Sequence, residues 1–433
     1  YIIIYIILLV IILEVTKEER NIKIYPAYKM LSWDLLFYYS INFIFLTQIK
    51  GISASNVLFA EACYPVFKII LLIPLTALIN KIGKRNSLIL ANIVNALSIL
   101  SYIMAKDLSL VLLGQCLSAI AFDIKGVVET NILCDSLPQN GKRGYAFSKI
   151  DGKGMAWYYY VDAISSVAAG FLYVINGYLP FILCLICCLI SAVLSFKFED
   201  IKKENQEVVS TKKYIKDLKN SFKYMMQSDR LKYLFIFGAV FAALLGVLVS
   251  LRSGTLEQIG VPEQYFGVIF ALLGIVSGIS AKNQNRIHNK FTNKTLAVIS
   301  VPTTISCIIM GLCLIGKFNF KVILIILLVL FFIQFLAKGA FYTLIKRYLN
   351  NFTNSSLRSK ITSAYNLVES IARAGVALCA SWLLKITTPS NTVLVLGCVI
   401  TIIIVLLLDS MRNKVGLKPE EYSKKDIEFL ELH

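Results

Sequence analysis

Nine charged residues lie inside long apolar stretches of this 433-residue sequence, and their chemistry is the first thing to explain. Five are acids and four are bases: Glu61, Asp123, Glu129, Asp162, Glu369, Lys68, Lys125, Lys338 and Arg373. A charge within a membrane-spanning helix costs at least about 2.5–3.5 kcal/mol, so such residues usually face a partner or a water-filled cavity. A carboxyl group in such a site can take up and release a proton. The pattern therefore predicts proton exchange inside a membrane.

Residue spacing predicts how these charges pair along single helices. Three acid–base pairs share a helix face because their members are seven or four residues apart: Glu61 with Lys68, Lys125 with Glu129, and Glu369 with Arg373. A fully paired set would be structural, a way to tolerate burial. The acids outnumber the bases, however, and Asp162 has no base within its own stretch. At least one acid is therefore expected to be functional.

Roles follow from the type of each side chain. The acids are candidates for the proton carrier, with the first three preferred: Asp162, Glu61, Asp123, Glu129 and Glu369. The bases are candidates for substrate binding or for switchable charge pairs, chiefly the last two: Lys68, Lys125, Lys338 and Arg373. Trp157 and Tyr158 join them, because the aromatic run 157–160 covers nearly every face of a helix and π faces suit flat or cationic ligands. Packing and interface anchoring is the alternative for each aromatic ring.

The composition shows what kind of element positions these groups. The chain is 57% hydrophobic and 16% charged, whereas soluble domains are about 45–50% apolar and about 25% charged. Apolar runs of about 20 residues recur, and each is long enough to cross the bilayer as a helix. The sequence predicts an all-α integral membrane protein with twelve transmembrane helices: 33–50, 55–79, 87–105, 108–136, 152–176, 178–196, 231–252, 263–282, 295–316, 320–348, 360–385 and 391–411.

A polar stretch in the middle divides the chain into two halves. We expect residues 1–15 to be a non-native or disordered N-terminal extension. Residues 16–196 and 231–411 are expected to form two six-helix bundles, with a cytoplasmic linker at 197–230 between them and a cytoplasmic tail at 412–433. Within the linker, Ile215, Leu218, Phe222 and Met225 follow helical spacing with lysines on the other face. This pattern predicts an amphipathic helix on an anionic membrane surface; a solvated linker is the alternative.

Basic residues are distributed unevenly between alternate loops. The N-terminal segment, the even-numbered loops and the C-terminal tail hold 34 Lys and Arg, and the odd-numbered loops hold 6. Positive residues mark the cytoplasmic side, so both termini and the linker are expected there, in the cytoplasmic membrane of a bacterium. This bias accounts for the net charge of +18 without nucleic-acid binding.

Other kinds of chemistry lack the residues that they need. The sequence holds no phosphate-binding Gly-rich motif, and His288 and His433 lie in a loop and in the tail. Most of the ten cysteines lie in apolar runs, where cysteine behaves as a small hydrophobe. We expect no enzyme, metal site or cofactor; a proton or sodium gradient would drive the work.

The segment 73–88 carries a recognisable motif between two apolar runs. Asn80, Lys81, Gly83, Lys84 and Arg85 stand in a short basic loop. They match the second half of the motif Gly-x-x-x-Asp-[Arg/Lys]-x-Gly-[Arg/Lys]-[Arg/Lys]. This motif is typical of the loop between the second and third helices in the major facilitator superfamily. Over roughly residues 30–411 the chain resembles that superfamily, of the bacterial twelve-helix type. Thr76 replaces the first Gly and Asn80 replaces the Asp, so the resemblance implies a cytoplasmic gating loop without the usual acidic group.

The resemblance also implies a way of working. Members of the superfamily are monomeric secondary transporters that alternate access to a small-molecule substrate across the lipid bilayer. The span 152–176 resembles part of a Gly/Pro-rich antiporter motif, with Ser165, Ala169, Gly170 and Gly177 but without the Pro. Proton-coupled export of a small amphipathic compound is preferred on this ground. Uptake of a sugar, peptide or metabolite, and a non-transporting receptor on the same fold, remain alternatives.

Overall fold

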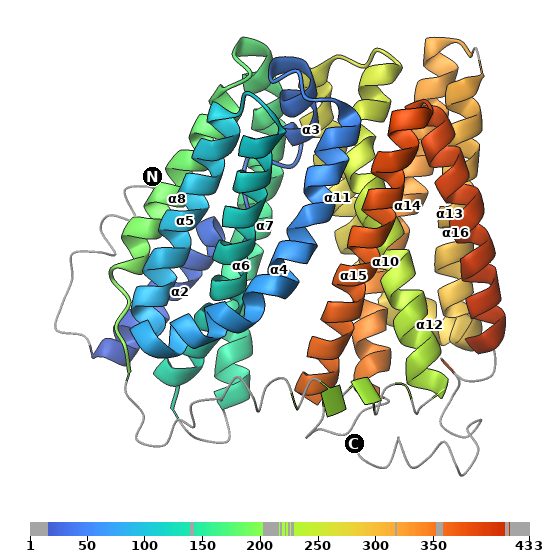
Figure 1. The fold of residues 1–433 in the computed structure, drawn as a ribbon. Helices are drawn as coiled ribbons and strands as arrows, with labels where there is room; N and C mark the ends of the chain where they lie inside the picture. Colours follow the sequence, from blue (N-terminus) through green and yellow to red (C-terminus); the bar gives the residue numbers. More distant parts are fainter. Residues whose placement is uncertain are drawn as a thin grey trace. The chain divides into compact units, whose positions relative to one another are not determined.

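The computed structural model describes residues 16–138, 143–201, 229–316, 318–351 and 358–411, with a few single residues between 216 and 226 and at 415. The described residues form helices joined by short turns, without a strand among them (Figure 1). The expected all-α class is confirmed. The expected N-terminal extension lies outside the described residues. So do three residues of the expected amphipathic helix, Ile215, Leu218 and Met225, whereas its Phe222 is helical and exposed.

Each expected span after the first corresponds to a helix, within a few residues except that α7 begins nine residues earlier and α10 ends six residues later than expected. These helices are α4 (Ala54–Ile82), α5 (Lys84–Met104), α6 (Leu108–Ser136), α7 (Arg143–Ile175), α8 (Leu179–Ser195), α10 (Asp229–Gln258), α11 (Phe266–Lys282), α13 (Thr295–Ile315), α14 (Phe320–Asn351), α15 (Arg358–Ile386) and α16 (Pro389–Met411). In the described part of the chain, 10 helices are long and apolar enough to cross a membrane, and α8 is a shorter apolar helix. A further short helix, α12 (Gln284–Phe291), precedes α13.

The first expected span, 33–50, is wrong as a single helix. The chain forms α2 (Lys17–Ser32), a turn, α3 (Asn42–Ile44) and a π-helical segment η1 (Phe45–Ile49). The break has a local cause. The Asp34 carboxylate accepts hydrogen bonds from the Leu35 backbone N–H at 2.9 Å and the Tyr39 hydroxyl at 2.6 Å, which competes with helical pairing. Phe37 adopts a φ of 62°, outside the right-handed helical range.

The described residues form two compact units. The first unit comprises 16–42 and 67–201, and the second comprises 43–66 and the described residues after 210. In the first unit α2 packs on α7, α8 and α6, and α5 packs on α6 and α8. Its core includes the fully buried rings of Tyr28 and Phe198, which meet edge to face at a centroid distance of 5.2 Å. The domain boundaries expected from the sequence stay a prediction.

The second unit pairs its helices closely. Helix α10 packs on α15 and α16, α13 packs on α16 and α14, and α11 packs on α14. Residues 54–66 of α4 belong to this unit, while the rest of α4 belongs to the first. The residues just before α4 also pack here: a Cβ on Gly254 of α10 would lie 2.7 Å from the Phe43 ring, so the glycine makes room for this ring.

A glycine sets the approach of α11 to α14. A Cβ added at Gly339 of α14 would lie 2.0 Å from the Ser277 carbonyl oxygen of α11. At the same place the Ser277 and Ser280 hydroxyls each donate to a carbonyl of α14, those of Phe335 and Leu336, at 2.6 Å. Small residues and hydroxyl donors are a common means of close packing between membrane helices. This contact therefore depends on the absence of a side chain at 339.

We expect Gly339→Ala to destabilise the protein by about 1–3 kcal/mol, because the new methyl group forces α11 away from α14 and lengthens both hydroxyl bonds. Gly278→Ala is the matched control, since a Cβ there meets nothing within 4 Å. Thermal unfolding of the purified variants in detergent measures both. Equal unfolding temperatures for the two variants would contradict the packing argument.

Candidate functional site

Glu129 of α6 lies at the centre of a buried polar network in the first unit. Its Oε2 atom forms an ion pair with Lys29 Nζ of α2 at 3.1 Å. Its Oε1 atom accepts hydrogen bonds from the Tyr28 hydroxyl at 3.1 Å and the Ser32 hydroxyl at 3.3 Å. Lys29 and Glu129 are only 3% and 4% exposed. Both carboxylate oxygens are thus satisfied, as a charge withdrawn from water requires.

The network continues to a second carboxylate. Lys29 Nζ lies 3.6 Å from Asp151 of α7, and the Tyr25 hydroxyl donates to Asp151 at 2.7 Å. The ammonium group also lies 4.1 Å from the centre of the Trp33 ring. Gly154 of α7 permits this approach, because a Cβ there would lie 2.8 Å from Lys29 Cβ. One lysine therefore connects three helices of the first unit.

The expected pairing of Lys125 with Glu129 is wrong, because Glu129 takes Lys29 as its partner. Lys125 is only 2% exposed, and its ammonium has no hydrogen-bond partner among the described residues. It lies 4.4 Å from the centre of the Phe122 ring. Among the described residues, the Phe122 ring face rather than an ion-pair partner is therefore the group that the Lys125 amino group meets.

Lys68, which was expected to pair with Glu61, lies against a different acid. Its Nζ is 3.3 Å from Asp123 of α6, with Lys68 34% exposed and Asp123 buried. The second Asp123 oxygen has no hydrogen-bond partner among the described residues. Spacing along one helix was thus a poor guide here, because the partner lies on another helix of the same unit.

The expected pair of Glu369 with Arg373 in α15 is confirmed. Arg373 Nε and Nη2 lie 2.8 and 2.7 Å from Glu369 Oε1, and Nη2 also donates to the Tyr342 hydroxyl of α14 at 2.7 Å. Gly246 of α10 leaves room for the guanidinium, since a Cβ there would lie 3.0 Å from Nη1. The pair belongs wholly to the second unit.

Glu61 has the simplest surroundings of the candidate acids. It lies in the part of α4 that belongs to the second unit, where the Ser250 hydroxyl of α10 is its polar neighbour. It takes part in no ion pair within the described part of the chain. An intramembrane carboxylate without a countercharge is costly, and a bound proton removes that cost.

The other candidates lie apart from these groups. Asp162 of α7 is close enough to the Tyr158 and Tyr159 hydroxyls to interact with them electrostatically. Tyr158 is buried, so packing accounts for much of its role. The ring of Trp157 lies 4.9 Å from Lys153 Nζ, and Lys338 Nζ lies 5.2 Å from the Phe335 ring.

The basic loop between α4 and α5 is tied to neighbouring helix ends in the first unit. Gly83 has a φ of 85°, which favours glycine, and it caps α5. Lys84 forms an ion pair with Asp135 at the end of α6. Arg85 donates to carbonyl oxygens after α8, those of Phe196 at 2.8 Å and Phe198 at 2.7 Å. Asn80 and Lys81 are exposed.

Sequence reasoning missed Lys29, Tyr28 and Asp151, which complete the largest buried network. Lys29 had been counted with the basic N-terminal segment, because α2 is too polar to resemble a membrane span. One signal was present in the sequence. Thr16 is followed three residues later by Glu19, which matches a helix-start pattern, and the Thr16 hydroxyl accepts from the Glu19 backbone N–H at 3.3 Å. This pattern predicts a helix that starts at residue 17, where α2 begins.

Helices of membrane-spanning length, several of them with buried charged side chains, define a multi-pass integral membrane protein. The sequence matches the family model of the Major Facilitator Superfamily over residues 30–310, more than half of the chain. The chain therefore belongs to the Major Facilitator Superfamily. No curated protein matches the sequence.

Solved structures share this fold at low sequence identity. The nucleoside transporter NupG is similar with a TM-score of 0.72 and 10% identity over 92% of this chain and 100% of that chain. A bacterial homologue of the human lysosomal transporter Spinster has a TM-score of 0.64 and 12% identity over 92% and 96%. A POT family transporter in complex with 5-aminolevulinic acid has a TM-score of 0.59 and 16% identity over 91% and 94%.

Lys29→Met is expected to lower the free energy of unfolding by about 3–5 kcal/mol, because it leaves the buried Glu129 carboxylate without its countercharge. The double variant Lys29→Met with Glu129→Gln should recover much of this loss. Lys23→Met is the control, since Lys23 is on the same helix but exposed. Thermal unfolding in detergent measures all three, and a double variant no more stable than the single one would refute the pairing.

Proposed function

We propose that this protein is a proton-coupled secondary active transporter that works by alternating access. Its membership of the superfamily supports the transporter class. The observation that carries proton coupling is Glu61, an acid in a membrane-spanning helix that takes part in no ion pair among the described residues and has the Ser250 hydroxyl, not a base, as its polar neighbour. Protonation and deprotonation of this carboxyl group change the charge of α4 without breaking an ion pair.

Asp123 and Asp162 are the alternative carriers, for different reasons. Asp123 already has Lys68 as a countercharge at 3.3 Å, so its proton exchange would be linked to the separation of that pair. Asp162 lies beside tyrosine hydroxyls in α7. Glu129 and Glu369 are less suitable, because each has a close basic partner that stabilises its charge.

Export of a small amphipathic compound is the proposed direction. It is supported by the partial antiporter motif of α7, whose Ser165, Ala169 and Gly170 are buried, as residues that allow close helix packing should be. The distribution of Lys and Arg supports cytoplasmic termini in a bacterial cytoplasmic membrane. The alternative is uptake of a nucleoside, peptide or other metabolite, and the transport assay must distinguish this uptake from export.

In proteoliposomes with an internal pH dye, a transported compound is expected to evoke a pH change that Glu61→Gln abolishes, because a neutral amide carries no exchangeable carboxyl proton. The panel comprises sugars, peptides, nucleosides and lipophilic cations. Applying each compound on one side and then on the other gives the direction of transport.

Two further variants make this test specific. Ser250→Ala keeps the Glu61 carboxyl group but removes the hydroxyl beside it, so it should retain proton flux. Asp162→Asn tests the second candidate in the same assay. Full proton flux in Glu61→Gln together with its loss in Asp162→Asn would transfer the carrier role to Asp162, and an unchanged response in both would exclude these two carriers.

A further inference from the structure

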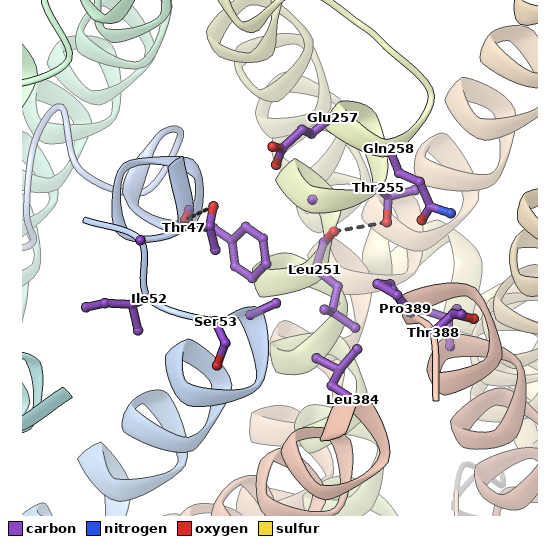
Figure 2. A pocket seen from close by; sticks show the side chains of 15 residues that line it. Thr47, Ile52, Ser53, Leu251, Thr255, Glu257, Gln258, Leu384, Thr388 and Pro389 are labelled. Atoms are coloured by element: carbon purple, nitrogen blue, oxygen red, sulfur yellow. Dashed lines mark hydrogen bonds between the residues drawn. The ribbon is translucent and has the colours of Figure 1, made fainter. Parts of the chain in front are cut away.

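The second unit contains a pocket of about 710 Å³ at the C-terminal end of α10, whose lining includes none of the charged residues described above. Its walls come from three parts of the chain within this unit: 43–54, 251–258 and 384–393. Ile52, Leu251, Leu384 and Pro389 supply apolar surface (Figure 2). The volume is in the range of small-molecule sites, which are mainly apolar with a few polar groups.

Two of the four hydroxyl groups that line this pocket, those of Thr47 and Thr255, already donate to backbone carbonyls, whereas those of Ser53 and Thr388 accept from backbone N–H groups. The Thr47 hydroxyl donates to the Phe43 carbonyl at 2.9 Å, and the Thr255 hydroxyl donates to the Leu251 carbonyl at 2.9 Å, both drawn as dashed lines in Figure 2. A hydroxyl has one hydrogen and two acceptor lone pairs. These threonines can therefore offer only lone pairs to a molecule in the pocket.

A carboxylate adds to this acceptor character. Glu257 alone is charged among the described residues that line the pocket. Its Oε1 atom accepts from Gln48 Nε2 at 2.7 Å, while Oε2 forms no hydrogen bond within the described part of the chain. Glu257 is only partly buried and forms no ion pair among the described residues. The pocket thus combines apolar walls with a single carboxylate and with two threonine hydroxyls that offer only lone pairs.

We infer that this pocket binds a primary ammonium group attached to an apolar body. An ammonium carries one positive charge and three donor hydrogens and accepts none, which complements Glu257 and the two threonine hydroxyls. The apolar part would lie against Leu251 and Leu384. A free amphipathic amine and the ethanolamine headgroup of a lipid share this chemistry. The inference does not depend on the coupling ion or on the direction of transport.

Binding in this pocket also has a conformational effect. The segment 43–54 meets α10, α15 and α16 around it, and the adjoining start of α4 is held to α15 by reciprocal bonds. The Ser55 hydroxyl donates to the Ser381 carbonyl at 2.8 Å, and the Ser381 hydroxyl donates to the Ser55 carbonyl at 2.9 Å. An occupant that touches both walls favours the state in which 43–54 is packed on these helices.

The test measures binding of 2-phenylethylammonium to the full chain in nanodiscs of phosphatidylcholine and phosphatidylglycerol, which contain no primary amine. The neutral compound 2-phenylethanol has the same shape and is the ligand control. We expect saturable binding of the amine and about tenfold weaker binding to Glu257→Gln, since loss of one partly buried charge pair is worth roughly that factor. The amine should also slow amide hydrogen exchange in residues 43–56.

Glu263→Gln is the matched protein control. Glu263 also accepts from Gln48 Nε2, at 3.4 Å, but it does not line the pocket, so this variant should bind the amine normally. Equal affinity for the amine and the alcohol, or equal losses in the two Glu variants, would overturn the inference. Adding phosphatidylethanolamine to the nanodiscs distinguishes the two sources of the ammonium group. If the lipid weakens the apparent binding of 2-phenylethylammonium, its headgroup is the occupant; if the affinity for 2-phenylethylammonium is unchanged, the occupant is a free amine.

Discussion

The need to satisfy charges withdrawn from water is the constraint on which the first unit depends. Lys29 reaches carboxylates on α6 and α7 from α2, and Tyr28 adds a hydroxyl to the same acid. Each of these side chains must face inward, so the ion pairs fix how the three helices are turned about their axes. Hydrophobic burial alone cannot do this in a bilayer, where the surroundings are also apolar.

The second unit relies on a different device. Gly339 brings α14 against α11, and serine hydroxyls donate to carbonyls across the contacts of α11 with α14 and of α4 with α15. Such contacts are short, neutral and specific to one spacing of the helices. The charged pair of Glu369 with Arg373 lies along one helix, so it stabilises α15 and, through Tyr342, its neighbour α14.

Most of the helices could be predicted because each apolar run must cross a bilayer of fixed thickness, and that requirement acts locally along the chain. The Glu369–Arg373 pair could be predicted for the same reason, since both partners lie on one helix. The partners of Glu129 and Lys68 could not, because each lies on a helix distant in sequence. Helix α2 was missed since its polar residues are used inside the unit, which hydropathy does not register.

The division of α4 between the two units has a mechanical meaning. Glu61 and Lys68 lie on one continuous helix, about 10 Å apart along its axis, yet the first contacts α10 of the second unit and the second contacts α6 of the first. Each half of α4 is therefore held by side chains of a different unit. The charge of Glu61 therefore acts on a contact inside the second unit, and the charge of Lys68 acts on a contact inside the first.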